Sequence, residues 1–232
     1  MTSTMHHRGG GGTGSEPRHV VVVMGPPGAG KGTQARRLSE RFDMPHVSTG
    51  EILRAIARTD SPLAREIREI QASGELVDDA IMARLVSLRT SEPDCERGYF
   101  LDGFPRTLGQ AELLETLNGE GHTPIAIAIE VPTEALMLRL TGRRQCPVCG
   151  TLYNVFTNPP RVEGVCDLEG SPLTHRSDDT VEAVGVRLFE YEKETAPVLA
   201  FYGARGRLVS IDGSGDPDRI FADIVGRLEA LL

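Results

Sequence analysis

The stretch GPPGAGKGTQ, residues 25–34, follows a run of valines and sets several glycines around one lysine. Glycine lets a loop curl until several backbone N–H groups converge on one anion, and a helix that starts there adds the positive end of its dipole. Lys31 adds a full charge toward β- and γ-phosphates. The pattern predicts a phosphate-binding loop of the Walker type, although Gly32 stands between Lys31 and Thr33. The competing interpretation, a glycine turn with a solvated lysine, is disfavoured between a buried strand and a helix.

A carboxylate and an arginine follow a second apolar run, in YFLDGFPRT, residues 99–107. Asp102 is expected at the carboxyl end of a strand, where open α/β sheets bind ligands, and it could hold magnesium-bound water. Arg106 follows in the same loop. A helix cap and a surface ion pair are the plainer interpretations of these two residues. Further arginines that flank expected loops are Arg54, Arg139, Arg143, Arg176 and Arg187. Six such arginines in an acidic chain favour a polyanion held from several sides, because the guanidinium fork pairs with phosphate oxygens.

The cysteines give the third chemical signal. Cys146, Cys149 and Cys166 are clustered, and Cys95 lies apart. No disulfide framework is evident, which is typical of a reducing compartment, and we expect the cytoplasm. The cluster is a candidate metal site, and three free thiols are the alternative. Cys95 is expected to be a packed thiol.

Composition limits the class of protein. The 232-residue chain has a formal net charge of −8 and is 39% hydrophobic, as a globular protein is. An acidic chain is not expected to bind nucleic acid as its main partner. We find no apolar run long enough to span a membrane and no apolar signal core, so no membrane partner is expected. Residues 1–17 are rich in glycine and serine and are expected to be a disordered tail.

Apolar runs alternate with helical spacing along the chain, which predicts a parallel α/β sheet. Strands are expected at 19–24, 44–48, 98–103, 124–131 and 207–212. Helices are expected at 32–42, at 51–73 with a break near 60–62, and at 180–202 with a bend at Pro197. Helical periodicity is lost over 142–179, which indicates a small inserted unit.

Taken together, these motifs make the chain similar to adenylate kinases of the long-lid type, from about residue 18 to residue 232. The motifs that carry the resemblance occur in the family's order: GPPGAGKGTQ, STGEILR, GELVDD, LDGFPRT, GRR, NPPRVEG and RSDD. The resemblance implies a P-loop NTPase-like, three-layer core with a five-stranded parallel sheet. It implies a core of residues 18–47, 78–141 and 180–232, an AMP-binding insertion at 48–77 and a mobile lid at 142–179. We expect a monomer.

The resemblance also implies a set of site residues. Those implied to bind ATP are Gly28, Ala29, Gly30, Lys31, Gly32, Thr33, Arg139, Arg143, Leu152, Tyr153 and Gly215. Those implied to bind AMP are Thr49, Arg54, Glu75, Leu76, Val77, Gly103, Phe104, Pro105, Arg106, Gln110, Arg176 and Arg187. Those implied to act in catalysis are Lys31, Asp102, Arg106, Arg143, Arg176 and Arg187. One departure is Glu51, where the family usually has Asp.

Some members of this family carry zinc in the lid, where the fourth ligand is usually Cys or Asp. Here the C-x-x-C pair Cys146 and Cys149 is followed by Cys166 and then by Glu169, which fits a carboxylate ligand with a longer arm. Asp167 and His175 are alternative fourth ligands. Four such ligands form a closed, structural site, and a unit this small needs one because it cannot build a proper core. We therefore expect structural Zn²⁺ as well as Mg²⁺ with ATP.

The reaction implied is MgATP + AMP ⇌ 2 ADP, which maintains adenine nucleotide balance. Phosphoryl transfer needs positioning, charge neutralisation and exclusion of water more than covalent help, and the AMP phosphate is already anionic, so no general base is required. Arginines brought by a closing lid would meet these needs. The alternatives are a kinase with UMP, CMP or GMP as acceptor and a nucleotide-binding switch without transferase activity. A zinc-ribbon nucleic-acid binder is disfavoured by the acidic charge.

Overall fold

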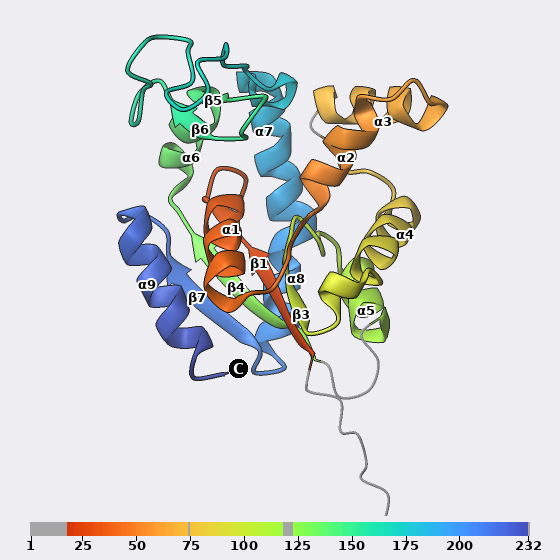
Figure 1. Ribbon diagram of the computed structural model, residues 1–232. Coiled ribbons are helices and arrows are strands. Elements are labelled where there is room, and N and C mark those ends of the chain that lie inside the picture. The colour runs from red at the N-terminus through yellow and green to blue at the C-terminus, as the bar shows by residue number, and fades with distance from the viewer. Residues whose placement is uncertain (1–17, 74, 118–122, 232) are drawn as a thin grey trace, which may run out of the picture.

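The computed structural model describes residues 18–73, 75–117 and 123–231. Its centre is a parallel sheet of five strands in the order β2-β3-β1-β4-β7 (Figure 1). The strands are β1 (His19–Met24), β2 (His46–Ser48), β3 (Gly98–Asp102), β4 (Ile125–Glu130) and β7 (Leu208–Asp212). The five strands predicted from the apolar runs are confirmed, as is the parallel α/β class. Within the described ranges, no helix is long and apolar enough to cross a membrane.

The central strand β1 explains why the fold has three layers. Its valines are buried on both faces, and successive side chains point to opposite sides of the sheet. Val20 and Val22 pack into one core cluster with side chains of the helices α4 (Asp79–Thr90), α5 (Leu108–Leu117) and α8 (Ala196–Gly203). Val21 and Val23 pack into the other with side chains of α1 (Lys31–Phe42) and α9 (Pro217–Leu228). Burial on both faces is what a continuous valine run, without polar alternation, dictates.

Only some of the helices that cover the two faces of the sheet were predicted from the sequence. The one predicted at 32–42 is α1 (Lys31–Phe42), and the break predicted near 60–62 separates α2 (Thr49–Ala57) from α3 (Pro62–Ser73). Four further helices had no bounds predicted from the sequence. They are α4 (Asp79–Thr90), α5 (Leu108–Leu117), α6 (Thr133–Thr141) and α9 (Pro217–Leu228). In α4 and α9 an aspartate N-cap, Asp78 or Asp216, starts the helix by accepting from its first N–H groups.

The helix predicted at 180–202 is one continuous helical segment with an irregular turn. It comprises α7 (Val181–Glu190), a π-helical turn η3 (Tyr191–Thr195) and α8 (Ala196–Gly203). The N–H of Ala196 donates to the carbonyl of Tyr191, five residues back. Pro197 explains the change, because it has no N–H and its ring crowds the carbonyl four residues before it. A bend was predicted at Pro197. The irregular turn instead lies just before that residue, at Tyr191–Thr195.

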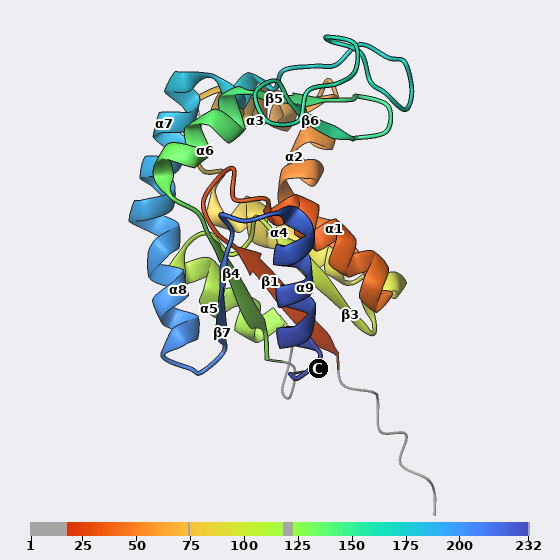
Figure 2. The same cartoon turned by 90° about the vertical axis from the view of Figure 1, so that its left-hand side faces the viewer.

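Two units rise above the sheet at the end where residues 25–30 lie, as both ribbon views show (Figures 1 and 2). One is formed by α2 and α3. The other contains the antiparallel pair β5 (Arg143–Gln145) and β6 (Leu152–Asn154), followed by the short helix η2 (Ser177–Asp179). α7 stands between them, and α3 contacts both α7 and η2. Another short helix, η1 (Pro93–Cys95), precedes β3.

The tail predicted at 1–17 lies outside the described residues. The division into core, AMP-binding insertion and lid stays a prediction, although its boundaries at 48–77 and 142–179 enclose the two units above the sheet.

Glycine at position 98 is required by the pairing of β3 with β1. Gly98 has φ +138°, and a Cβ there would overlap the carbonyl oxygen of His19, its partner in register. We expect Gly98→Ala to lower the free energy of unfolding by at least about 2 kcal/mol, because both the backbone angle and the space forbid the methyl group. The matched control is Gly226→Ala in α9, where a Cβ meets nothing within 4 Å. That change should raise stability by about 0.5 kcal/mol through helix propensity. Urea unfolding of both variants gives the measurement, and equal stabilities would contradict the assignment of register.

Candidate active site

The loop between β1 and α1 forms a cradle of backbone N–H groups. Gly25, Gly28 and Gly30 all have positive φ, at 137°, 83° and 94°. Gly30 is the N-cap of α1 and no side chain caps this end of the helix. The first N–H groups of α1 are therefore directed at the same space as the loop, which is where an anion is stabilised.

Lys31 adds a positive charge to this cradle, at the first position of α1. Its Nζ donates to the carbonyl oxygens of Gly25, at 2.8 Å, and Pro26, at 2.9 Å. Burial lowers the pKa of Lys31 from 10.5 to about 8; Asp102 opposes this shift, and the positive charges of nearby arginines add to it. The protonated form of Lys31 is therefore less favoured than in water, and a bound anion would favour it again.

Asp102 ends β3 beside the same loop. Its Oδ2 lies 3.6 Å from Nε2 of His46, and a Cβ on Gly32 would come within 3.2 Å of it. Gly32, the residue that interrupts the strict motif, therefore lets this carboxylate approach the start of α1. Burial by itself raises the pKa of Asp102, but the imidazole of His46 and the charge of Lys31 outweigh it and hold this pKa below its usual value. An ionised oxygen donor of this kind suits Mg²⁺ or its bound water.

Arg106 is fixed from three directions. Its Nε donates to the carbonyl of Gly103 at 2.8 Å, and its backbone N–H donates to Oε1 of Gln110 at 2.7 Å. Its carbonyl accepts from the buried hydroxyl of Thr195 at 2.9 Å, in the π-helical turn η3. Gly103, with φ +85°, leaves room for Arg106 on one side and Thr49 on the other. Within the described residues, the guanidinium group of Arg106 donates to the carbonyl of Gly103 and forms no ion pair with a carboxylate.

Two cavities meet at this arginine. The first, of about 540 Å³, is lined by Lys31 and residues 103–106, and by Glu190 and Tyr191 from the start of the π-helical turn. The second, of about 670 Å³, is lined by Thr49, Arg54, Gln71, Glu75, Leu76, Val77, Met82, Gln110 and Asp178, among others. Leu76, Gly103, Arg106 and Arg187 line both. Two cations therefore stand where the two cavities join.

A fully buried carboxylate holds two more of the predicted arginines. Asp179 is 0% exposed, and Arg143 donates to it with two nitrogens, at 2.7 and 2.5 Å. Arg187 donates to Asp179 at 3.3 Å and to the carbonyl of Asp178 at 2.8 Å. Both aspartates belong to the RSDD motif, for which no role of these two residues was predicted from the sequence. Two adjacent acids that follow an arginine were the available signal.

Arg54, Arg106 and Arg176 lie close enough to this pair to interact with its charges. Arg176 donates to Gln145 at 2.8 Å, and burial together with the charges of Arg143 and Arg54 lowers its pKa to about 10. Burial also lowers the pKa of Arg106, and the charge of Arg187 adds to that effect. Arg139 lies at the end of α6 and donates to the carbonyl of Gly213 at 3.1 Å. The arrangement is a concentration of positive charge in which Arg143 and Arg187 are paired with Asp178 and Asp179.

Some predicted site residues lie elsewhere. Tyr153 is buried inside the upper unit, where its hydroxyl accepts from the N–H of Asp167 at 2.8 Å and lies 3.6 Å from Sγ of Cys166. Its ring therefore packs in the interior of that unit and lines neither cavity. Leu152 and Gly215 line neither cavity as well. Gly215 follows the loop that Arg139 contacts.

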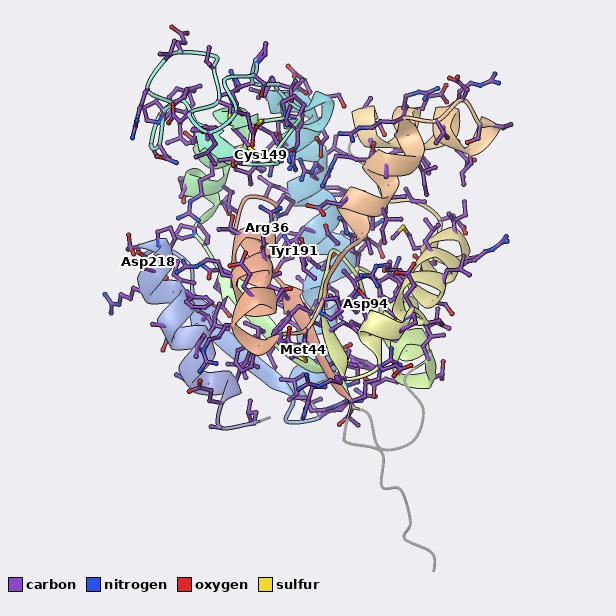
Figure 3. All side chains as sticks on the ribbon, in the orientation of Figure 1. Arg36, Met44, Asp94, Cys149, Tyr191 and Asp218 are labelled. Atoms are coloured by element: carbon purple, nitrogen blue, oxygen red, sulfur yellow. The ribbon has the colours of Figure 1, made fainter. Side chains whose placement is uncertain are left out.

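Three thiols come together in the upper unit, where Cys149 is labelled (Figure 3). The sulfur atoms of Cys146, Cys149 and Cys166 lie within 4.8 Å of one another, and the carboxylate of Glu169 is not within this group. Burial alone would raise the pKa of Cys146, but hydrogen bonds from the Ser171 hydroxyl and from backbone N–H groups lower it to about 6. All four cysteines of the chain are free thiols.

The loops that carry these thiols repeat one geometry. Gly150 N–H donates to Cys146 O, and Gly170 N–H donates to Cys166 O in the same way. Both glycines have positive φ, at 74° and 65°. Cys149 and Glu169 occupy corresponding positions just before these glycines. The second loop thus offers Glu169 where the first offers Cys149.

Comparison with known proteins agrees with this geometry. A family model described as adenylate kinase matches residues 23–207. The chain is 48% identical over 206 residues to an adenylate kinase of Caldanaerobacter subterraneus, covering 88% of this chain and 93% of that protein. It is 46% identical over 213 residues to an adenylate kinase of Bacillus subtilis, covering 91% and 98%. A Staphylococcus aureus adenylate kinase is 45% identical over 213 residues, covering 91% and 99%.

The lowered pKa of Lys31 has a measurable consequence for anion binding. Near pH 8 the ammonium form is partly lost, and a bound triphosphate would restore it by raising the pKa. We therefore expect binding of a nucleoside triphosphate to take up protons near this pH. Titration calorimetry in two buffers of different ionisation enthalpy measures the uptake.

The control is Lys31→Arg, because a guanidinium group stays protonated and leaves no proton to be gained. Equal proton uptake by the two proteins would show that Lys31 is not the group that titrates.

Proposed function

The chain belongs to the adenylate kinase family and transfers a phosphoryl group reversibly between ATP and AMP, and we propose that the transfer takes place between Arg106 and Arg187. The observation that carries this proposal is that both arginines line both cavities. A group that passes from one nucleotide to the other must cross this junction, and its charge would be met there by two guanidinium groups.

The donor nucleotide is proposed to lie on the side of the loop after β1. Residues 28–33 would bind its phosphates through backbone N–H groups, and Lys31 would contact the β- and γ-phosphates. Arg139 and Arg143 would approach from the end of α6. The neighbouring loop that contains Gly215 would border the base, together with Leu152 and Tyr153.

The acceptor AMP is proposed to occupy the larger cavity. Thr49, Arg54 and Gln110 line it, as do Glu75, Leu76 and Val77. Arg54 and Arg106 would bind the AMP phosphate, with Arg176 and Arg187 reaching it from above. Gly103 lines the cavity too, and Phe104 and Pro105 continue the same loop, so that its backbone would support the phosphate from below.

This geometry would perform the chemistry by position and charge. The AMP phosphate is an anionic nucleophile, so no proton has to be removed from it. Arg106 and Arg187 would neutralise the charge that spreads over the equatorial oxygens of the transferred group. Mg²⁺ accompanies ATP in kinases and supplies further neutralisation, and Asp102 would hold it through bound water. Once these groups surround the bound nucleotides, little further reorganisation is needed when the charge develops.

Residues 142–179 are proposed to act as a lid that excludes water. Arg143 is anchored to Asp179, and Arg187 is bonded to both Asp178 and Asp179. Motion of the β5–β6 unit would therefore move these arginines at the same time as the lid closes over the site. Exclusion of water matters because water could accept the phosphoryl group in place of AMP.

The lid is further proposed to hold structural Zn²⁺ through Cys146, Cys149, Cys166 and Glu169. Three converging sulfur atoms and a repeated loop support this. The carboxylate of Glu169 would have to turn toward the sulfurs, which its longer side chain permits. A tetrahedral site with four protein ligands is closed and has no catalytic position. Its role would be to fold a unit whose described core cluster is only Cys146, Tyr153, Cys166 and the adjoining Leu173.

A monomer in the cytoplasm is proposed as well. Free thiols suit a reducing compartment, and the net charge of −8 disfavours nucleic acid as a partner.

Replacement of Arg106 tests the junction directly. We expect Arg106→Ala to lower kcat for ADP formation by about 10³-fold, because the charge it supplies is needed most in the transition state. A coupled assay with saturating ATP and AMP gives the measurement. Arg84→Ala on the exposed side of α4 is the matched control and should keep full activity. Near-normal turnover of the Arg106 variant would remove this residue from the mechanism.

Metal analysis tests the zinc proposal. Protein purified without added metal should contain zinc in equimolar amount, and Cys149→Ser or Glu169→Gln should lower both this content and the melting temperature, because a structural site contributes to folding. Glu163→Gln, an exposed change in the same unit, serves as control. Zinc content near zero in the unmodified protein would exclude the site. Full content in the Glu169 variant would leave the three cysteines as ligands and exclude Glu169.

A further inference from the structure

A hydrogen-bond chain links the start of α4 to the floor of the larger cavity. Gln110 in α5 lines this cavity and is 2% exposed. Its Nε2 donates to Oδ1 of Asp79 at 2.6 Å. Its Oε1 accepts from the backbone N–H of Arg106 at 2.7 Å. Of the two side-chain amides that line the cavity, Gln71 and Gln110, only Gln110 is buried.

These two partners permit only one orientation of the Gln110 amide. A carboxylate only accepts hydrogen bonds, and a backbone N–H only donates. A reversed amide would set its oxygen against the Asp79 carboxylate and its NH₂ group against the N–H of Arg106. Both contacts of the buried Gln110 side chain would then be mismatched, although Asp79 itself is exposed, and an unmade hydrogen bond of a buried group is costly. The orientation therefore follows from the network.

Asp79 is itself held in place. Its Oδ2 accepts from the hydroxyl of Thr107 at 2.8 Å, and the same hydroxyl oxygen accepts from the backbone N–H of Gln110 at 3.1 Å. Asp79 is the first residue of α4 and Thr107 immediately precedes α5. The neighbouring Asp78 caps α4 by accepting from the N–H groups of Ala80 and Ile81. Capping is thus done by Asp78, and the Asp79 carboxylate is directed at the cavity wall.

We propose that Asp79 is a specificity-determining residue, which selects a 6-aminopurine acceptor by fixing the orientation of the Gln110 amide. An amide has two N–H donors and two acceptor lone pairs, so that one of each remains after the bonds to Asp79 and Arg106. Adenine offers a donor at its 6-amino group and an acceptor at N1, which match the pair that remains. A 6-oxopurine offers an acceptor and a donor in the same two places, so it matches only the reversed amide.

This inference rests on the proposed placement of AMP in the larger cavity. It extends that proposal from the residue that contacts the base to the residue that orients it. Asp79 has no contact with the nucleotide in this scheme, and it acts through Gln110. Its effect should therefore appear in the choice of base and be absent from the affinity for ATP.

The experiment compares AMP with IMP, which differs from AMP only at this edge of the purine. Wild-type protein should prefer AMP strongly in kcat/KM. We expect Asp79→Asn to lower the AMP/IMP ratio roughly tenfold or more, because an asparagine NH₂ group accommodates the reversed Gln110 and one of its two mismatches disappears. The KM for ATP should be unchanged.

The matched control is Asp78→Asn, which removes the same charge at the neighbouring position and keeps a good N-cap. Its AMP/IMP ratio should equal that of the wild type. Thr107→Val, which frees one oxygen of Asp79, should lower the ratio by less than Asp79→Asn does. This second variant decides the matter if Asp79→Asn proves too unstable to assay.

A further variant separates failure of the inference from failure of its premise. If Gln110→Leu lowers the AMP/IMP ratio but Asp79→Asn and Thr107→Val leave it unchanged, Gln110 contacts the base and Asp79 has no part in selecting it. If Gln110→Leu also leaves the ratio unchanged, the proposed AMP site is wrong, and the role of Asp79 falls with it.

Discussion

Repulsion among buried cations is the constraint on which the rest of this structure depends. Lys31, Arg106, Arg143 and Arg187 lie close enough for the three arginines to lower the pKa of the lysine. Burial is the larger cause of the lowered pKa, since charged groups lose hydration when they leave water. Such a cluster is tolerated only if the surrounding protein fixes each group separately. The result is a site whose electric field is directed at the phosphate groups of the nucleotides, so that little reorganisation is needed during the transfer.

Carboxylates reconcile this cluster with a stable fold. Asp179 is fully buried between Arg143 and Arg187, and Asp102 faces Lys31 from the end of β3. Asp179 is shared by two arginines, and Asp102 faces more than one cation. These carboxylates therefore do not neutralise all of the positive charge, and part of it remains for a ligand. The π-helical turn before Pro197 belongs to the same system, because it brings the Thr195 hydroxyl to the carbonyl of Arg106. Arg106 and Arg187 are thereby tied to a single helical segment, and their separation is set by backbone geometry.

The upper unit solves a different problem. Its small core cluster buries little apolar surface, and the unit is held instead by two loops of the same shape and by a group of thiols. The repeat can be seen in the sequence as CPVCG and CDLEG, spaced so that Cys149 corresponds to Glu169. Tyr153 completes this interior, with its hydroxyl oxygen 3.6 Å from Sγ of Cys166.

Local pattern alone determined much of this protein. The alternation of apolar runs with helical spacing predicted a parallel α/β sheet, and the glycines around Lys31 predicted the phosphate loop, because strand burial and glycine loops depend on neighbours in sequence. Six arginines beside expected loops were visible in the sequence, and similarity to a known family supplied the role expected of each. Only the tertiary structure decided which carboxylate holds Arg143, which way the Tyr153 ring turns and how the Gln110 amide is oriented. These contacts join residues far apart in the chain, and they depend on how helices pack and which rotamers fit, neither of which is encoded in the spacing of residue types.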